Sequence, residues 1–414
     1  MPGPPLTRTR TLLYSAGSIG AGAFYAFNNF VLPQLLKAAG AGDLLTGLLA
    51  STRSIEGAII QPTIGALSDR TRTRLGRRRP YVAVGIPLSA ALFLFAATQH
   101  DVLGLTISIV LFSIFFNIAA DPYVALLADI TAPGERGILQ GVSTGIQLVS
   151  QVAFLALISI AVGTGDIPGW SYVLVAALMV ATFGVTVFGV REPPVADTPT
   201  PDEARLGLRG YLAELLEQRQ AMRYLAAIFT FMVGFSAVLP YLTLFITVDI
   251  GETQQVALGL AAGTLLVTAV AAVAFGRVAD RIGNKPVLVA GWAILAVAAC
   301  GGIVIQQLPE TIAVVLLAGV GNGAATAAGW PLLASLVPAE KTGVFAGLKA
   351  AAESIAIPAS VVIAAEVFLP HFSYRGVFVL LAGAILIALY ILVRHVRPPT
   401  SAPAAVPIDD PALS

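Results

Sequence analysis

The sequence predicts an all-α membrane protein whose twelve transmembrane helices form two pseudo-symmetric six-helix bundles, with both termini in the cytoplasm. Three observations predict this fold class: the composition, the number of apolar segments and an internal repeat. The 414 residues are 57% hydrophobic and 11% charged, and the mean hydropathy is +0.85. Soluble domains are about 45–50% apolar and about 25% charged. The composition therefore excludes a soluble globular protein.

Each of the apolar segments has about the 17–25 residues that a helix needs to cross the hydrocarbon core. Their glycines and alanines suit the close packing of helices in lipid. The first segment follows basic residues, as in a signal peptide, but its length and the nearness of the second segment favour a spanning helix. The approximate limits are residues 11–36, 44–67, 81–99, 102–127, 137–163, 170–190, 222–247, 255–279, 286–306, 311–336, 344–369 and 375–393.

The basic residues set the orientation. With a cytoplasmic N-terminus, all but four of the 24 lysines and arginines fall in cytoplasmic segments. The exceptions are Lys37 and Arg375, which would face outside, and Arg53 and Lys349, which lie within spans. The positive-inside rule therefore predicts a multi-pass protein of the cell membrane with cytoplasmic ends. The net charge of +1 gives no reason to expect a nucleic-acid partner.

The longest polar interval divides the chain. We expect the first bundle in residues 1–190, a cytoplasmic linker in 191–221, the second bundle in 222–397 and a disordered tail in 398–414. The linker is interpreted as a tether between the bundles rather than as a regulatory site. Its second half carries the stripe of an amphipathic helix that lies on the membrane surface. The stripe consists of Leu208, Tyr211, Leu212, Leu215 and Leu216.

An internal repeat supports the two bundles. "GALSDRTRTRLGRRRP" after the second span corresponds to "GRVADRIGNKP" after the eighth, with Gly65 matched to Gly276 and Asp69 to Asp280. "TAPGERGILQG" after the fourth span corresponds to "LVPAEKTGVFAG" after the tenth at nearly the same offset. Two correspondences at one offset indicate two homologous halves. Repeats of this kind, with a site at their interface, are typical of transporters.

These motifs resemble a known family. The glycine, aspartate and arginines of the loop after the second span resemble the signature loop of the major facilitator superfamily. The resemblance to the superfamily covers nearly the whole chain. Residues 55–80, "IEGAIIQPTIGALSDRTRTRLGRRRP", and 117–130, "NIAADPYVALLADI", further resemble its sucrose and glycoside cation symporters. The resemblance implies the major facilitator fold and a monomer without a cofactor. It also implies secondary active transport of a sugar or glycoside by alternating access, coupled to protons or another cation.

The charged loop is interpreted as a conformational latch between the halves. Gly65 lets the second helix pass close to a neighbouring helix, and Asp69 can sit against the N-terminus of that helix. The resemblance implies that the neighbouring helix is the eleventh span. We expect Asp129 to pair with Arg70 or with one of the three arginines 77–79. The alternative is that these arginines only set the topology. The loop residues assigned to gating are Gly65, Asp69, Arg70, Arg77, Arg78, Asp129, Gly276, Asp280 and Arg281.

Charges within the spans are the next signal, because a charge at the bilayer centre costs roughly 2.5–3.5 kcal/mol on insertion scales. Arg53 and Glu56 share one face of the second span, and Lys349 and Glu353 share one face of the eleventh. The resemblance implies that these two helices adjoin, so Arg53 and Glu353 are expected to bridge the halves as gating residues together with Lys349. The alternative is that these ion pairs only neutralise each other.

Proton coupling is assigned to Asp121. The plant sucrose symporters carry a proton-linked aspartate where this chain has Ser113, so the family's carrier is absent. Asp121 lies about nine residues, or roughly 13 Å, from the cytoplasmic end of the fourth span. Glu56 is the second candidate, but Arg53 within one turn should hold it ionised. A uniporter without coupling is the remaining alternative.

The resemblance implies that spans one, four, seven and ten line the central cavity. Their amides can hydrogen-bond sugar hydroxyls, and their aromatic rings can lie against the apolar face of a pyranose. The alternative is that these side chains only satisfy one another between packed helices. The residues expected to bind substrate are Tyr25, Asn28, Asn29, Asn117, Tyr123, Tyr241, Asn322 and Trp330.

Other function classes have less support in the sequence than sugar transport. His100, His371 and His395 lie near span ends, and neither a paired His and Glu metal motif nor a G-x-x-x-x-G-K phosphate loop is present in the sequence. An enzyme, a metal site and ATP-driven transport are therefore not expected. Export of amphipathic drugs or lipids, or the handling of a pigment or lipid on the same scaffold, remains the alternative because the spans are rich in Ala, Phe and Leu.

Overall fold

The computed structural model describes residues 7–51, 63–65, 67–68, 71–132, 135–163, 167–192, 217–338 and 341–397. The regular elements of this part are helices, together with an isolated bridge between Thr73 and Gly76. Several expectations lie outside the described residues. They concern Arg53, Glu56, Asp69 and Arg70, most of the linker (193–216) and the tail (398–414).

Helices cover the described parts of the first six expected spans. The first span is divided into α1, α2, a π-helical turn η1 and α3, and the second begins with α4. The remaining four expected spans correspond to single helices. The elements are α1 (Arg8–Ser15), α2 (Gly17–Ala26), η1 (Phe27–Val31), α3 (Leu32–Ala38), α4 (Asp43–Ala50), α6 (Arg79–Ala96), α7 (Val102–Ile130), α8 (Arg136–Val162) and α9 (Trp170–Gly189).

The second half repeats this plan. Its seventh and eleventh expected spans are divided, and its eighth, ninth, tenth and twelfth are single helices. The elements are α11 (Arg219–Phe235), α12 (Val238–Leu244), η3 (Phe245–Asp249), α13 (Gln254–Ile282), α14 (Asn284–Val304), α15 (Leu308–Ser335), α16 (Thr342–Ile363), η5 (Ala364–Phe368), α17 (Leu369–Phe372), η6 (Ser373–Arg375) and α18 (Gly376–His395).

Prolines account for two of the π-helical turns. Pro33 follows η1, and Pro370 follows η5. A proline has no N–H to donate, and its ring clashes with the carbonyl four residues earlier, which lies inside the preceding turn in both cases. Widening that turn to a π-helix relieves the clash without ending the helix.

Nine helical stretches within the described residues are long and apolar enough to cross a membrane. The eleventh and twelfth expected spans fall within one of them, Val344–His395. The first expected span and the described start of the second fall in shorter helices of 8, 10, 7 and 8 residues. The chain is therefore an all-helical integral membrane protein.

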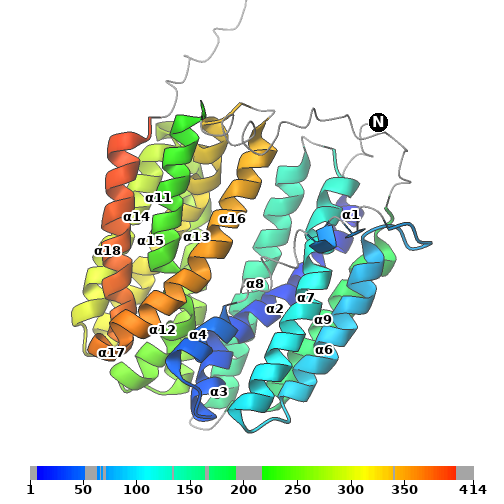
Figure 1. Cartoon of the computed structure of the whole chain (residues 1–414), viewed down its shortest axis with the longest axis horizontal. Helices are drawn as coiled ribbons and strands as arrows, with labels where there is room; N and C mark the ends of the chain where they lie inside the picture. The colour runs from blue at the N-terminus through cyan, green and yellow to red at the C-terminus, as the bar shows by residue number, and fades with distance from the viewer. Residues whose placement is uncertain are drawn as a thin grey trace, which may run out of the picture.

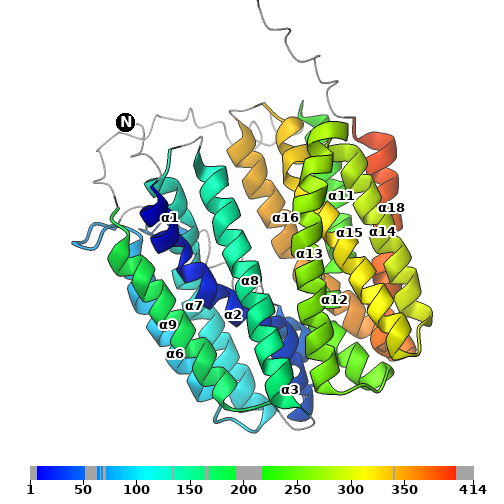
Figure 2. The same cartoon turned by 180° about the vertical axis from the view of Figure 1, so that it is seen from behind.

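The two halves lie side by side. Figure 1 shows α1 to α9 on one side of the molecule and α11 to α18 on the other. The halves approach each other at the end where α3, α4, α12 and α17 lie, here called the convergent end. They separate toward the end where α1 begins and α18 ends, here called the divergent end. The view from behind shows the same arrangement (Figure 2).

The internal repeat recurs in the packing. A Cβ on Gly85 of α6 would lie 2.9 Å from the Phe115 carbonyl oxygen of α7, and a Cβ on Gly291 of α14 would lie 2.9 Å from the Gly321 carbonyl oxygen of α15. Both members of the second pair follow those of the first by 206 residues. Only glycine therefore allows these two helix pairs to pack as closely as they do, and the halves use it at equivalent positions.

A second equivalence lies at the divergent end. The Arg79 Nε donates to the Val187 carbonyl near the end of α9, and the Lys285 Nζ donates to the Val393 carbonyl near the end of α18 at 3.3 Å. These pairs are again 206 residues apart. A basic side chain that meets the last carbonyls of a helix satisfies them and complements the helix dipole.

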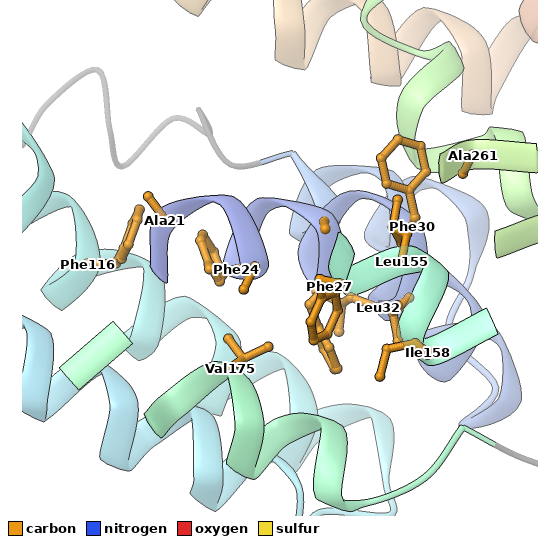
Figure 3. Close-up of a cluster of buried hydrophobic side chains, with 14 of the residues drawn as sticks. Ala21, Phe24, Phe27, Phe30, Leu32, Phe116, Leu155, Ile158, Val175 and Ala261 are labelled. Carbon is orange, nitrogen blue, oxygen red and sulfur yellow. The ribbon is translucent and has the colours of Figure 1, made fainter. Parts of the chain in front are cut away.

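Aromatic side chains form much of the core of the first half. The ring of Phe27, at the start of η1, packs 4.9 Å from that of Phe93 and 4.7 Å from that of Tyr172. The Phe30 side chain, in the same π-helical turn, points toward Ala261 of α13 in the second half (Figure 3). In lipid, such packing stabilises helix association through van der Waals contact rather than through exclusion of water.

Candidate functional site

Two cavities share part of their lining, and together they are called the central cavity here. One, of about 310 Å³, lies within the second half between α11, α14, α15 and α16. The other, of about 240 Å³, lies between the halves and is lined by α4, η1, α11, α12 and α16. Both are lined by Met232, Phe235 and Glu353. The central cavity is therefore formed by both halves.

An ion pair forms part of the wall of the central cavity. Lys349 and Glu353 are four residues apart on α16, so they share one helix face, and the Lys349 Nζ donates to the Glu353 carboxylate. Glu353 is 9% exposed, whereas a quarter of the Lys349 side chain is accessible. The pairing lowers the cost of placing either charge within the membrane.

Aromatic rings form an apolar part of the wall of the central cavity. Trp292 stacks on Phe231 with ring centroids 4.9 Å apart, and Phe231 stacks on Phe235 at 5.3 Å. Trp330 of α15 also lines the cavity and is 42% exposed. Flat apolar faces of this kind suit the apolar face of a sugar ring or a planar ligand.

Three of the eight residues expected to bind substrate line the central cavity. Asn29 of η1 lines the part between the halves, and Asn322 and Trp330 of α15 line the part within the second half. Their amides and indole are hydrogen-bonding groups of the kind that recognise hydroxyls. Sequence reasoning missed the rest of the polar lining, which includes Ser51, Ser236 and Thr326.

The other expected substrate residues have contacts between helices. The Asn28 Nδ2 donates to the Ala50 carbonyl at 2.6 Å, which joins η1 to the last residue of α4. The Tyr123 hydroxyl donates to the Tyr14 carbonyl at 2.9 Å, and the Tyr14 hydroxyl donates to the Tyr123 carbonyl at 3.1 Å. Asn28 and Tyr123 therefore join packed helices in this structure, and their expected role in substrate binding stays a prediction.

Tyr241, Tyr25 and Asn117 also lie in packing contacts. The Tyr241 hydroxyl donates to the Asp43 carbonyl at 2.7 Å, and its side chain is fully buried at the convergent end. Tyr25 is half-buried, with its ring 6.0 Å from that of Phe116. The Asn117 Nδ2 donates to the Ser113 Oγ at 3.3 Å.

Asp121 follows Asn117 by one turn of α7 and is half-buried. The next residue, Pro122, lies inside the helix. A carboxylate at this depth is costly unless other groups stabilise it. Its expected role as the proton carrier stays a prediction.

The charged loop binds the end of α7. The Arg77 Nε donates to the Asp129 Oδ2 at 3.1 Å and its Nη2 to the Oδ1, while the Arg78 Nε donates to the same carboxylate at 3.2 Å. The expected pairing with Asp129 is thus made by Arg77 and Arg78. All three residues belong to the first half, so this contact does not join the halves.

The expected close approach at Gly65 is absent from the described structure. A Cβ at Gly65 or at Gly276 would have no described heavy atom within 4 Å. The Gly65 carbonyl instead accepts a bond from the Arg78 Nη1 at 3.4 Å. The expected close contact at Gly65 is thus not made with a described residue in this conformation, in which the halves separate at the divergent end, and the gating role of both glycines stays a prediction. Asp280 and Arg281 are exposed at the end of α13.

Glu192 is a loop residue that sequence reasoning missed. Its carboxylate accepts bonds from the backbone N–H groups of residues 77, 78 and 79, at 2.7, 3.1 and 2.9 Å. These groups include the start of α6, where helix N–H groups have no partners within the helix. Gly76 has φ +111°, and a Cβ there would lie 2.5 Å from the Glu192 carboxyl carbon. Glycine is therefore required beside this contact, and its position before the arginines was the available sequence signal.

Comparisons with known proteins agree with this architecture. The family model described as MFS/sugar transport protein matches residues 13–374. The chain is 26% identical over 198 residues to the lactose permease of Lactobacillus helveticus, an alignment that covers 42% of this chain and 30% of that protein. It is 28% identical over 159 residues to the sucrose transport protein SUT4 of Oryza sativa subsp. japonica, covering 32% of this chain and 27% of that one. These alignments span about a third or less of each relative's length.

Solved structures share the fold over almost their whole length. A D-xylose-proton symporter superposes with a TM-score of 0.70 at 16% identity, covering 94% of this chain and 98% of that one. A point mutant of the nucleoside transporter NupG superposes with a TM-score of 0.74 at 11% identity, covering 93% and 99%. These similarities show a shared fold. The match of the family model over most of the chain indicates a transporter rather than an enzyme, and it shows that the chain belongs to the MFS/sugar transport protein family of the major facilitator superfamily.

Proposed function

We propose that the protein is a secondary active transporter that moves a sugar or glycoside across the cytoplasmic membrane by alternating access, with proton-coupled symport. The observation that carries this proposal is the central cavity, to whose lining both halves contribute. It combines amides from both halves (Asn29 and Asn322), an exposed indole (Trp330) and an ion pair (Lys349 and Glu353). Hydroxyl groups can bond to the amides and the carboxylate, while the indole suits the apolar face of a pyranose.

We further propose twelve spans in two bundles, residues 1–190 and 222–397, in a monomer with both termini in the cytoplasm. The first helix begins and the last helix ends at the divergent end (Figure 1). The arginines 77–79 and Lys285 also lie at this end, because they contact the ends of α7, α9 and α18. The positive-inside rule then makes the divergent end cytoplasmic. On this assignment, the structure represents the state that is closed toward the outside.

The roles of the charged residues follow from this assignment. Asp121 is the proposed proton carrier, with Glu56 as the second candidate. Lys349, Glu353 and Arg53 form the proposed gate within the membrane, and the loop that holds Asp129 forms the proposed inner latch. A ligand hydroxyl that bonds to Glu353 would compete with Lys349 for the carboxylate, which gives substrate binding a direct effect on the gate.

Export of an amphipathic drug or lipid is the second candidate function. The stacked rings of Phe231, Phe235 and Trp292 give the central cavity an apolar wall that such a molecule would also fit. Uptake by purified protein in proteoliposomes separates the two functions. We expect counterflow of labelled disaccharides or glycosides, and accumulation when an inward pH gradient is imposed. Efflux of an amphipathic dye without sugar counterflow would instead support export and reject the proposed function.

A further inference from the structure

The convergent end carries a polar contact between the halves that is centred on Asp43. Asp43 is the first residue of α4, and its carboxylate Oδ1 accepts a bond from the Tyr374 hydroxyl of η6 at 2.9 Å. Its backbone carbonyl accepts a bond from the Tyr241 hydroxyl of α12 at 2.7 Å. Lys37, in the same half as Asp43, donates to the same Oδ1 at 2.9 Å. Asp43 therefore binds two tyrosines of the second half and one lysine of its own half.

The chain is shaped to allow this contact. One turn after Asp43, a Cβ at Gly47 would overlap the Tyr241 hydroxyl and would lie 2.5 Å from the Val361 Cγ1 of α16. Tyr241 is fully buried, and the ring centroid of Tyr374 lies 6.0 Å from that of Tyr241. The absence of a side chain at Gly47 thus lets α4 approach α12 and α16 until both tyrosines reach Asp43.

Gln34 opposes closure at the same end. Its side chain is 5% exposed, and neither its amide nitrogen nor its amide oxygen has a hydrogen-bond partner among the described residues. Gln34 follows Phe30 by four residues, and the Phe30 carbonyl and ring meet Thr243 and Ala261 of the second half (Figure 3). Gln34 lies in α3, just after the residues of η1 that meet the second half, and α3 packs against α12 of that half. Burying an amide without partners costs free energy that is regained when water reaches it.

We propose that Asp43 is the positioning residue of the outer gate, and that its bonds to Tyr241 and Tyr374 close this gate against the cost of burying the Gln34 amide. The bonds of Asp43 favour the closed conformation and the buried Gln34 amide favours the open one, so neither conformation is favoured overwhelmingly. A transporter needs such a balance, because a gate that is too stable would stop the cycle. The inference rests on the proposed function only for the assignment of the convergent end to the outside of the membrane.

The gate can be measured without substrate. Ala38 and Gln255 are exposed at the convergent end, one in each half, and Cys300 is the only cysteine in the sequence. Spin labels at A38C and Q255C in a C300S background would report the distance between the halves by pulsed electron resonance, with the full chain in lipid nanodiscs. We expect Tyr374→Phe to increase the population with the longer distance about tenfold, because hydrogen bonds to a carboxylate are among the stronger ones.

Two further variants make the test specific. Lys37→Met removes a bond to the same Asp43 oxygen from within one half, so it should leave the distance distribution unchanged. Gln34→Leu, added to Tyr374→Phe, should return the distribution toward that of the parent. An equal effect of Lys37→Met and Tyr374→Phe, or no effect of Gln34→Leu in that background, would overturn the proposal. Expected distance shifts without sugar counterflow would reject the proposed substrate but keep the gate.

Discussion

Lys349 and Glu353 form an ion pair one helical turn apart on α16, and the pair belongs to the wall of the central cavity. A charge within a membrane is costly unless it is compensated, and here each side chain compensates the other. The pair is also accessible to a ligand, because a quarter of the Lys349 side chain is exposed. These two residues can therefore have both a structural role and a role in binding, and a single and a double variant distinguish the two roles.

Removing one partner of this pair should cost more than removing both. Lys349→Met removes the cation that Glu353 contacts on its own helix, and we expect the free energy of unfolding to fall by about 2 kcal/mol, below the value for fully buried pairs because Lys349 is partly exposed. Lys349→Met combined with Glu353→Gln should recover at least half of this loss. Thermal unfolding measures stability, and counterflow measures transport. If the double variant regains stability but not counterflow, the pair acts in transport; recovery of both would reduce it to mutual neutralisation.

Trp330 should contribute to substrate affinity rather than to folding. The protein contains a second tryptophan of nearly equal exposure, Trp170 at the start of α9, which is 43% exposed compared with 42% for Trp330. We expect Trp330→Ala to raise the KM for sugar counterflow about tenfold, in keeping with about 1–1.5 kcal/mol for an aromatic contact. Trp170→Ala, the matched control, should leave KM unchanged. Equal KM values for the two variants would remove Trp330 from the site.

The fold could be predicted because apolar segment length and glycine position are local properties of the sequence. The expected fourth and eighth spans, residues 102–127 and 255–279, correspond to α7 and α13 within three residues at each end. The π-helical turn η1 was not predicted, although Pro33 marks its position. A proline in an apolar segment can kink, widen or end a helix, and the choice depends on neighbouring helices.

The site was predicted only in part because a helix turns about 100° per residue. Asn28 and Asn29 are adjacent in sequence, yet Asn29 lines the central cavity while Asn28 bonds to the end of α4. Sequence spacing alone does not say which of two neighbours faces the cavity. Glu192 was missed for a different reason: its partners lie 113 to 115 residues away in the chain, and no local pattern connects them.

Glu192 should hold the charged loop in place. Glu192→Gln replaces a carboxylate that accepts bonds from three backbone N–H groups, so we expect hydrogen exchange at residues 77–79 to accelerate about tenfold. Glu310→Gln is the matched control, because Glu310 also accepts a backbone N–H, from Gln306 at 3.2 Å, at the convergent end. Its substitution should leave exchange at residues 77–79 unchanged. Unchanged exchange in Glu192→Gln would show that the arginine contacts of the loop, including those to Asp129, hold it without Glu192.

The repeated glycine contacts predict equal costs in the two halves. Gly85→Ala and Gly291→Ala each place a methyl group 2.9 Å from a backbone carbonyl oxygen and a neighbouring alanine Cβ, so we expect each to lower the free energy of unfolding by about 1–3 kcal/mol. Gly184→Ala of α9 is the control, because its Cβ would have no described atom within 4 Å. That variant should be neutral or stabilising by roughly 0.5–1 kcal/mol. A neutral Gly85→Ala would mean that α6 and α7 can separate without cost.

Asp121 offers the sharpest test of coupling. In a symporter, the proton carrier must change protonation between the two conformations, and a variant that cannot ionise should lose uphill transport but keep exchange. Asp121→Asn retains the size of the side chain and its place one turn from Asn117 on α7. We therefore expect sugar counterflow to persist within about threefold, whereas accumulation driven by an imposed pH gradient should fall to the level of protein-free liposomes. Asn117→Asp, added to Asp121→Asn, places a carboxylate one turn away on nearly the same helix face. This second substitution should restore part of the accumulation if coupling depends on a carboxylate in this region of the helix rather than on Asp121 itself. Accumulation that survives in Asp121→Asn would move the assignment to Glu56.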